Sequence, residues 1–382
     1  MFKKVLIFSI ILCFCVLLPV ASKAVLTADQ LGDNGFSDSK NTESLLYKHK
    51  KWLFAYTNQT ELYKWIDATN TWQEITDVDV VTDKNNQGFS TIPMVWKGNV
   101  LLFVNNDIDG ARVYASELGT YQRDIFKKNK NKTFDWYQIN EDGFGNANTG
   151  VITARWKYKG DLFVAVQNQN DLAEIWKAES IGERVRENNW EDSVLWTQMG
   201  TEGLDDSIEQ INTGNKFKGD FYIGTEGGGV YVSSDNENWT LVEEFDGSVT
   251  ESIKLKSKLV VSEKDITNGV KLHKTKNGED FEQINTAGFG NKNNVDVSFL
   301  RKNWKERKII AITENNVDGF EMYATKKMEK NQWEEKVNTG IDSENNTKVT
   351  DFIKYKGRKY LATYNSEDGT AVYRFIRGDN QN

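Results

Sequence analysis

One pattern of apolar and polar positions recurs seven times along the chain from about residue 41 onward. In each copy an apolar segment runs into a short basic turn, a second apolar segment follows, and the copy usually closes on an aromatic residue and a loop rich in Gly, Asn and Asp. The clearest copies are residues 151–176 and 349–375, with turns at Lys159-Gly160 and Lys356-Gly357. The turns are about 40 to 60 residues apart, and a strand-built repeat of this length predicts a stacked or radial array, because one small sheet cannot bury both of its faces alone.

Within each copy the segments have the character of buried strands. Residues 99–104, 161–166 and 358–363 are short and apolar, and Gly, Asn or Asp bounds them. Asp-Gly pairs in the loops between the second and third segments predict tight hairpin turns. The chain has only two prolines and no sustained helical periodicity. Four antiparallel strands repeated seven times predict an all-β fold, a seven-bladed β-propeller.

The repeats divide residues 25–376 into one propeller domain, followed by a tail at 377–382. The expected blades are approximately 41–82, 83–145, 146–205, 206–247, 248–290, 291–342 and 343–376. The last blade lacks a fourth strand, while residues 28–36 resemble the ends of fourth strands at 137–145 and 283–290. We therefore expect the N-terminal segment 25–36 to complete the last blade and close the ring.

The first 24 residues have the pattern of a signal peptide. Lys3 and Lys4 precede an apolar run from Val5 to Val20, and small residues stand at Ser22 and Ala24, which predicts cleavage after Ala24. We expect an exported protein, either secreted or located in the cell envelope or periplasm. Both cysteines of the chain lie inside this run, so no disulfide is expected after cleavage.

Charge excludes one class of partner. Removing the segment takes away three lysines and no acids, so the formal net charge changes from −8 to −11. Nonspecific binding to nucleic acid is therefore not expected. We expect a monomer.

Several motifs resemble those of a known kind of protein. The loops at 143–146 and 288–291 both read Gly-Phe-Gly-Asn, and the turns at 233–239 and 275–281 are similar to a shortened Asp box. With the Lys-Gly turns, these motifs resemble secreted bacterial β-propellers of the sialidase/BNR-like kind. That resemblance implies functions from glycosidase to binding scaffold, and a sialidase would need an arginine cluster and a tyrosine–acid pair. Only Arg155 and Arg301 lie near the expected innermost strands.

A small polar residue stands at one equivalent position of every blade. The set is Ser44, Thr91, Thr153, Asn212, Thr250, Ser298 and Thr350. Innermost strands line the central channel, so we expect these groups to bind neighbouring backbone or ordered channel water. Recurrence in every blade favours a structural role.

Function is expected where the blades differ. The candidate catalytic residues, each contributed by a single blade, are Arg155, Glu209, Glu251, Asp296 and Asp351. Paired carboxylates beside an arginine could act as acid and base in glycoside hydrolysis. The alternative is that these acids are simply solvated or paired. Two carboxylates and Arg155 in one concave pocket would favour the enzyme.

Metal chemistry has weak support in the sequence. His49 and His273 lie in different repeats and lack ligand spacing. The hairpin aspartates offer oxygen ligands for calcium, although the geometry of Asp-Gly turns accounts for them equally well. The calcium candidates are Asp107, Asp109, Asp318 and Asp368. No other cofactor is expected.

Two longer excursions interrupt the repeat, at residues 126–133 and 181–190. Both should project on the face opposite the Asp-Gly hairpins. The first contains Lys127, Lys128, Lys130 and Lys132, which could contact an anionic wall polymer or membrane surface or could simply be a solvated loop.

Together these features favour an exported binding scaffold over an enzyme. We expect it to recognise a protein partner or a glycan through the face that carries the hairpin loops. A glycoside hydrolase or lyase with acids at the channel mouth is the first alternative. A structural envelope or adhesion component is the second.

Overall fold

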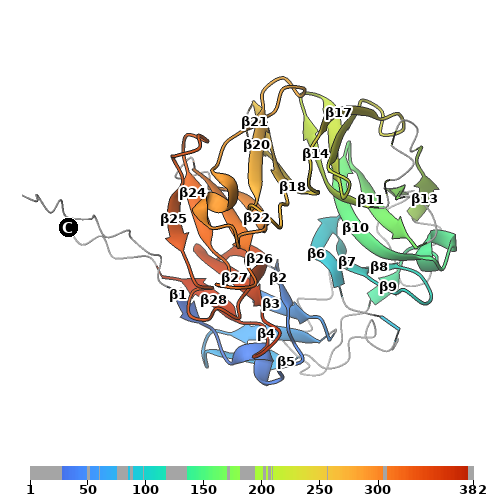
Figure 1. Cartoon of the computed structure of the whole chain (residues 1–382). Coiled ribbons are helices and arrows are strands. Elements are labelled where there is room, and N and C mark those ends of the chain that lie inside the picture. Colours follow the sequence, from blue (N-terminus) through green and yellow to red (C-terminus); the bar gives the residue numbers. More distant parts are fainter. Residues whose placement is uncertain are drawn as a thin grey trace, which may run out of the picture.

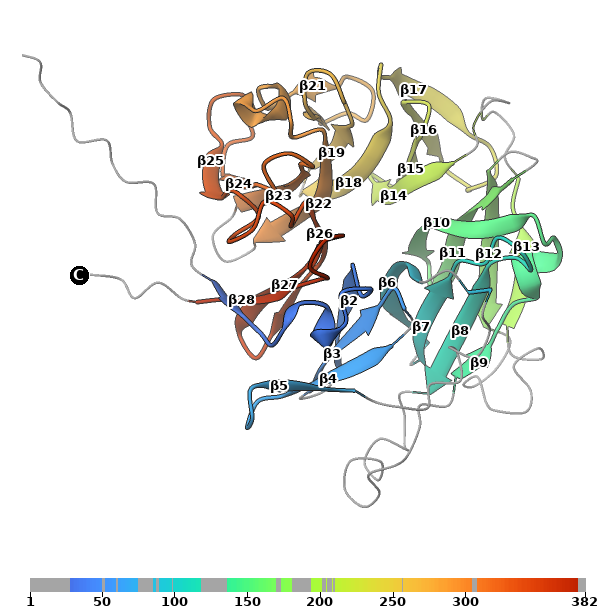
Figure 2. The same ribbon diagram turned by 60° about the horizontal axis from the view of Figure 1, so that its bottom comes forward.

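Seven four-stranded antiparallel sheets form a ring (Figures 1 and 2), and we call the region around its axis, beside the first strand of each sheet, the channel. This computed structural model describes residues 28–49, 52–59, 61–74, 85–86, 89–97, 99–117, 136–169, 173–180, 194–200, 204, 208, 210–255, 257–303 and 308–376. The predicted all-β, seven-bladed propeller is confirmed. Within these ranges no helix has the length and apolar character needed to cross a bilayer.

The first four blades follow one another along the chain, each described from its inner to its outer strand. Blade 1 contains β2 (Ser44–His49), β3 (Trp52–Thr57), β4 (Leu62–Ile66) and β5 (Thr71–Glu74). Blade 2 contains β6 (Phe89–Trp96), β7 (Asn99–Val104), β8 (Arg112–Glu117) and β9 (Trp136–Gln138). Blade 3 contains β10 (Thr149–Tyr158), β11 (Asp161–Asn168), β12 (Glu174–Ser180) and β13 (Val194–Gln198). Blade 4 contains β14 (Ile211–Phe217), β15 (Asp220–Thr225), β16 (Gly229–Ser233) and β17 (Thr240–Glu244).

The remaining blades repeat this plan, and the last one combines both ends of the domain. Blade 5 contains β18 (Val249–Leu255), β19 (Lys258–Glu263), β20 (Lys271–Thr275) and β21 (Glu282–Gln283). Blade 6 contains β22 (Asp296–Asn303), β23 (Lys308–Glu314), β24 (Met322–Thr325) and β25 (Glu334–Val337). Blade 7 contains β26 (Lys348–Tyr355), β27 (Arg358–Tyr364), β28 (Val372–Phe375) and β1 (Ala28–Gln30).

The N-terminal strand closes the ring, as the sequence predicted. β1 pairs antiparallel with β28, with Ala28 opposite Phe375 and Gln30 opposite Tyr373, and both views place the two strands side by side (Figures 1 and 2). The N–H of Leu31 continues the pairing by donating to Val372 O at 2.7 Å. The blade is therefore built from segments separated by almost the whole domain.

The core lies between neighbouring blades. In blades 4, 5 and 6 the second strand is buried at nearly every position, because both faces of each sheet are covered by adjacent sheets. Apolar side chains from two blades therefore share each cluster; Phe103 of blade 2 and Ile152 of blade 3 are both fully buried in one of them. Continuous apolar segments are what such doubly covered strands require.

An exit loop leads from the outer strand of a blade to the inner strand of the next, and three exit loops contain a short 3₁₀ turn. These turns are η1 (Asn34–Ser37), η3 (Asp142–Gly145) and η4 (Ala287–Gly290). In η4, Phe289 stacks on Tyr323 of the next blade with ring centroids 4.2 Å apart, and Trp333 meets it edge-on at 5.1 Å. The Trp333 Nε1–H then donates to Ile284 O of the preceding blade at 2.7 Å. The same arrangement recurs around Phe36 and Phe144, so the Gly-Phe motif joins adjacent blades.

Candidate functional site

The loops between second and third strands lie on one face of the ring, together with the exit loops. We call this the hairpin face. Four of its described hairpins share a turn that is closed by the first side chain of the loop. In blade 6, Asn315 Oδ1 accepts hydrogen bonds from the N–H groups of Val317 (3.0 Å) and Asp318 (2.8 Å). Asn106, Asp265 and Asn365 form the equivalent pairs of bonds. Such local bonds fix the backbone of the tips.

Each of these hairpins ends on a glycine that touches a glycine of the exit loop. In blade 5, Gly269 has a φ of 93°, and a Cβ on it would lie 2.6 Å from Gly288 Cα. In blade 6, a Cβ on Gly319 would lie 2.7 Å from Gly340 N. No side chain fits at such distances. The exit loop is therefore seated directly on the hairpin of its own blade.

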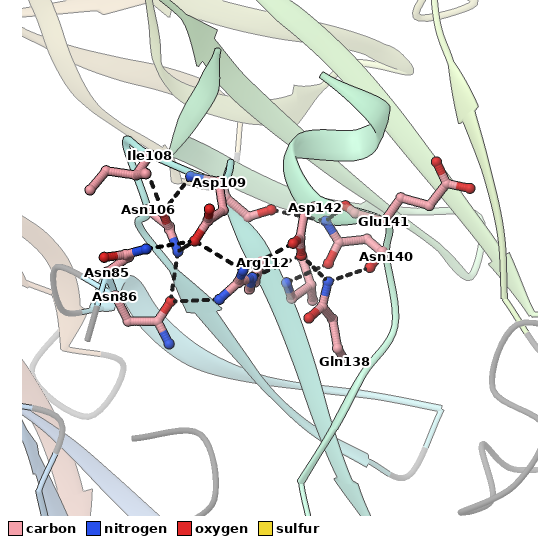
Figure 3. A network of polar contacts seen from close by, with 12 residues as sticks. Asn85, Asn86, Asn106, Ile108, Asp109, Arg112, Gln138, Asn140, Glu141 and Asp142 are labelled. Carbon is pink, nitrogen blue, oxygen red and sulfur yellow. Dashed lines mark hydrogen bonds and ion pairs between the residues drawn. The ribbon is translucent and has the colours of Figure 1, made fainter. Parts of the chain in front are cut away.

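The aspartates proposed as calcium ligands take part in these turns. Asp109 accepts from the amide of Asn85 at 3.0 Å and pairs with Arg112 at 3.4 Å. Arg112, which is buried, also pairs with Asp142 at 2.8 Å. Figure 3 shows this network linking the hairpin to the loop beyond β9.

The other aspartates of this group behave in a similar way. Asp318 accepts from the amides of Asn293 (3.0 Å) and Asn291 (3.2 Å), which lower its pKa. Asp368 accepts from Asn345 at 3.3 Å, and Asp107 is exposed. In the part of the chain that the structure describes, no three acidic, His or Cys side chains are grouped closely enough to hold a metal ion. Turn and loop contacts account for Asp109, Asp318 and Asp368.

In three blades a member of the polar ring at the inner strands bonds to the backbone of the next blade. Thr153 Oγ1 donates to Ile211 O and Thr350 Oγ1 donates to Ser44 O, both at 2.6 Å. Asn212 Nδ2 donates to Val249 O at 3.2 Å. The expectation that these groups bind neighbouring backbone is confirmed for these three, whereas the side chain of Thr91 lies outside the described part.

Two of the catalytic candidates have the same structural role. Asp351 is fully buried and accepts from the N–H of Leu46 in blade 1 at 2.9 Å and from its neighbour Phe352 at 2.6 Å. Asp296 accepts from the hydroxyl of Thr250 in blade 5 at 2.5 Å and from its neighbour Val297 at 2.7 Å. Burial raises the pKa of each to about 6 despite these bonds.

The remaining charged groups form no such bond to a neighbouring blade among the described residues. Burial raises the pKa of Glu251 to about 7, against the opposing charge of Arg301. Burial also lowers the pKa of Arg155 to about 10, although Asp351 opposes this shift. The Nε atoms of Arg155 and Arg301 are buried and bond to no described group. Their guanidinium groups lie 5.7 Å from the Phe103 ring and 4.7 Å from the Phe299 ring, respectively.

A hollow of about 470 Å³ opens at the mouth of the channel on the hairpin face. We call it the mouth hollow. Its charged lining residues are Glu43, Glu251, Asp296, Glu314 and Lys348. Two predicted acids therefore share one pocket. Arg155, which the enzyme hypothesis placed with them, is not among the lining residues.

Exposed aliphatic side chains stand at the tips of three hairpins. Ile108 is 62% exposed, Ile266 is 76% exposed and Val317 is 62% exposed. They occupy the second or third position of the closed turns in blades 2, 5 and 6. The tip of blade 7 has the exposed polar residues Ser366 and Glu367 instead.

The opposite face has a hollow of different charge. It measures about 400 Å³ and is lined by Lys356, Arg358 and Arg374 with Asp29 as its acid. Arg374 pairs with Asp29 at 2.9 Å, which also fastens the closing strand. The lysines predicted to form a basic patch on this face, at 127, 128, 130 and 132, lie outside the described residues, as does Glu209.

Comparison with known proteins shows the fold. No protein-family model matches the chain, and no curated protein matches its sequence. The structure of YCF48 bound to D1 peptide is 11% identical, with a TM-score of 0.58 over 94% of this chain and 99% of that chain. The Cps50 (Swd1) β-propeller domain of Myceliophteria thermophila is 11% identical, with a TM-score of 0.50 over 93% and 100%. The computationally designed Ika8 protein is 14% identical, with a TM-score of 0.51 over 91% and 99%.

At these identities the likeness establishes a β-propeller and nothing about its ligands. The sialidase/BNR-like kind remains a resemblance of motifs. Of those motifs, the Gly-Phe loops have a clear structural role in joining blades.

Sequence reasoning missed Glu43, Glu314 and the aliphatic tips. Glu314 directly precedes Asn315, the residue that closes its hairpin, and Val317 stands inside the same loop. A sequence signal could have identified them: at these positions the repeated hairpins differ from one another, and the geometry of the turn does not require a particular residue. No sequence signal of this kind identifies Glu43, because it reaches the mouth hollow only when the ring closes.

Proposed function

We propose that this chain is a binding scaffold that docks a partner protein on its hairpin face. The observation that carries the proposal is the set of exposed aliphatic tips at Ile108, Ile266 and Val317. The turn does not require them, since blade 7 builds the same turn with Ser366 and Glu367. Aliphatic side chains on a rigid frame are suited to protein contact, because little conformational entropy is lost when they dock.

The same face favours a protein over a glycan. A common way to bind a sugar ring, besides hydrogen bonds to its hydroxyl groups, is to stack it on an exposed aromatic ring. In the exit loops Phe36, Phe144 and Phe289 already stack on side chains of the next blade. The exposed tips are aliphatic, so the described part of the face offers better anchors to a polypeptide.

One comparison supports this interpretation. A structure of the same fold is described as YCF48 bound to D1 peptide, so a propeller of this fold can hold a peptide. The likeness is one of fold, and the tips of the present chain provide the specific argument.

The proposal can be tested by selection, which does not require an identified partner. The protein is panned against a random peptide display library and probed on a glycan array. Each binder is then measured against the triple variant Ile108→Ser, Ile266→Ser and Val317→Ser. We expect peptide binders that lose about 10-fold or more in affinity, which corresponds to about 1.4 kcal/mol.

A matched control is the double variant Leu195→Ser and Leu241→Ser. These leucines are 50% and 44% exposed on outer strands away from the tips, so their removal should leave binding unchanged. Binding confined to glycans, or peptide binding that the triple variant retains in full, would contradict the proposal.

A hydrolase or lyase is a second candidate, because Glu251 and Asp296 share the mouth hollow with pKa values raised to about 7 and about 6. Two carboxyl groups that titrate near neutrality can divide acid and base roles. Turnover of a polysaccharide panel that Glu251→Gln abolishes would favour this candidate. A panel without turnover at any pH from 5 to 8 would count against it.

We also propose that the scaffold acts outside the cytoplasm, on the basis of the signal-like segment at 1–24. Mass spectrometry of protein from the producing cell should find Val25 at the mature N-terminus. An N-terminus that still includes residues 1–24 in the cytoplasmic fraction would contradict export.

A further inference from the structure

Among the residues that line the mouth hollow, carboxyl groups outnumber basic groups, although Arg301 and Arg155 lower the pKa of Glu251 and Lys264 lowers that of Asp296. Four carboxyl groups line it and one ammonium group, that of Lys348, faces them. Burial raises the pKa of Glu43, and the charge of Lys348 only partly opposes this effect. Burying carboxylates without partners is unfavourable, so binding a cation in the hollow would be favourable.

Two of these carboxylates are free to accept a ligand. Asp296 is engaged with Thr250 and Val297, and the N–H of Ser252 bonds to Glu251. By contrast, the half-buried carboxylates of Glu43 and Glu314 form no hydrogen bond or ion pair with any described residue. Glu43 directly precedes β2 of blade 1 and Glu314 ends β23 of blade 6, and both line the hollow, so one bound group can contact both.

The surface of the hollow is mainly polar, with a smaller apolar part. Leu45, Val297, Phe299 and Val349 line it together with the carboxylates. A lysine or arginine side chain fits such a lining, since its charged end can bind the carboxylates while its methylene stem packs on the half-buried Leu45. A volume of about 470 Å³ also falls in the range of ligand pockets, about 300 to 1,000 Å³. A bare metal ion would leave most of this volume unfilled.

Aliphatic tips stand on the two blades that supply most of the acids. Glu314 ends β23, and Val317 is at the tip of the hairpin that follows it. Ile266 is at the tip of the adjacent blade 5, which also provides Glu251. Anchors for aliphatic side chains therefore stand over the same blades as the acidic hollow.

We propose that the mouth hollow binds a lysine or arginine side chain of the partner, within an extended segment whose flanking aliphatic residues pack on Ile266 and Val317. The proposal rests on the docking function argued above and specifies the chemistry of the partner. The acidic lining of the hollow favours a positively charged residue at the centre of the segment. The exposed aliphatic tips favour aliphatic residues on either side of it.

Synthetic peptides provide the direct test. Nine-residue peptides, blocked at both ends and labelled with a fluorophore, carry Lys, Gln or Glu at the centre and Leu and Val on either side. Fluorescence anisotropy measures their affinity for the full chain. We expect the Lys peptide to bind about 10-fold or more tightly than the Gln peptide, since a hydrogen bond to a charged group contributes about 1.5–3 kcal/mol. The Glu peptide should bind most weakly, and the preference for Lys should shrink at high salt.

Two double variants separate the parts of the site. Glu43→Gln with Glu314→Gln should abolish the preference for Lys over Gln while the Gln peptide binds as before. Ile266→Ser with Val317→Ser should weaken the Lys and Gln peptides alike. Glu367→Gln, at an exposed acid of a hairpin without an aliphatic tip, is the control and should change neither. Thermal melts of each variant should match the wild type, because all the replaced side chains are half-buried or exposed.

The outcomes also separate this inference from the proposed function. If Lys and Gln peptides bind equally and both still depend on Ile266 and Val317, the docking face stands and the cation site is overturned. If the variant without Glu43 and Glu314 keeps the full preference for Lys, the hollow is not the cation site. If no peptide of the series binds and the display library returns no peptide dependent on the tips, both proposals fail.

Discussion

The hairpins of blades 6 and 7 have the same frame and different tips. In both, an asparagine side chain closes the turn, an aspartate accepts from an asparagine of the preceding exit loop, and a glycine touches a glycine of the loop above. The tip of blade 6 presents Val317, whereas that of blade 7 presents Glu367. Residues that recur at equivalent positions build the ring, so a function is best sought at the positions where equivalent blades diverge.

The largest expected effect comes from breaking the frame that the two hairpins share. Gly319→Ala in blade 6 places a Cβ 2.7 Å from Gly340 N, where the backbone cannot retreat, at a φ of 78°. We expect a loss of about 3 kcal/mol or more in the free energy of unfolding. Urea denaturation monitored by tryptophan fluorescence measures it.

Gly357→Ala in blade 7 is the matched control. Gly357 has nearly the same φ, 80°, but a Cβ there meets nothing within 4 Å. The Gly357→Ala variant should lose only about 1–2 kcal/mol of unfolding free energy, the cost of a left-handed backbone conformation at a residue with a side chain. Equal losses at the two positions would show that the contact between hairpin and exit loop contributes nothing.

A second effect distinguishes Asp351 and Asp296, the buried acids on the inner strands of these two blades. Asp351 of blade 7 accepts from the backbone N–H of Leu46, which cannot rotate toward another acceptor as a hydroxyl can. Asp351→Asn should therefore cost about 2–3 kcal/mol, because an amide leaves a buried donor unsatisfied. Asp296→Asn should cost about 1 kcal/mol or less, since the Thr250 hydroxyl can turn to Ser262, 2.9 Å away. Chemical denaturation at pH 7.5 should rank the two in this order, and the reverse order would contradict the assigned bonds.

A third effect depends on pH. The pKa values of Asp296 and Asp351 rise from 3.8 to about 6 on folding, and that of Glu251 rises from 4.5 to about 7. The folded state therefore binds more protons than the unfolded state in this window, so stability should fall as the pH rises from 5 to 8. Glu251→Gln should flatten the decline by about 2–3 kcal/mol between pH 5 and pH 8, since one unit of pKa shift corresponds to about 1.4 kcal/mol. Stability that increases over this window, in wild type and variant alike, would contradict the shifts.

The fold was predictable because its determinants are local. Buried strands appear as continuous apolar segments, hairpins as Asp-Gly pairs, and the missing fourth strand as the likeness of residues 28–36 to other strand ends. Each of these signals lies within about ten residues of chain, and propeller architecture follows from repeating them.

The site was only partly predictable because its contacts are distant in sequence. Asp351 and Leu46 are 305 positions apart. The sequence around Asp351 does not show that its carboxylate accepts a hydrogen bond from a distant backbone N–H. The same holds for Glu43, which reaches the mouth hollow beside Glu314 only once β1 has closed the ring. The sequence predicted that Glu251 and Asp296 lie near the channel mouth. It could not show which carboxylates accept hydrogen bonds from the protein and which do not.

The change with the smallest expected effect on stability, an exchange of the two tips, is the most direct test of the comparison between blades 6 and 7. Exchanging the tips, with Val317→Glu in blade 6 and Glu367→Val in blade 7, replaces exposed side chains that the turn does not use. Each change should alter the free energy of unfolding by less than about 0.5 kcal/mol. Binding of the lysine peptide should nevertheless fall with Val317→Glu alone and stay low in the double exchange, because an aliphatic tip over blade 7 does not stand beside Glu314. Recovery of binding in the double exchange would mean that any aliphatic tip serves, and that position relative to the acids is unimportant.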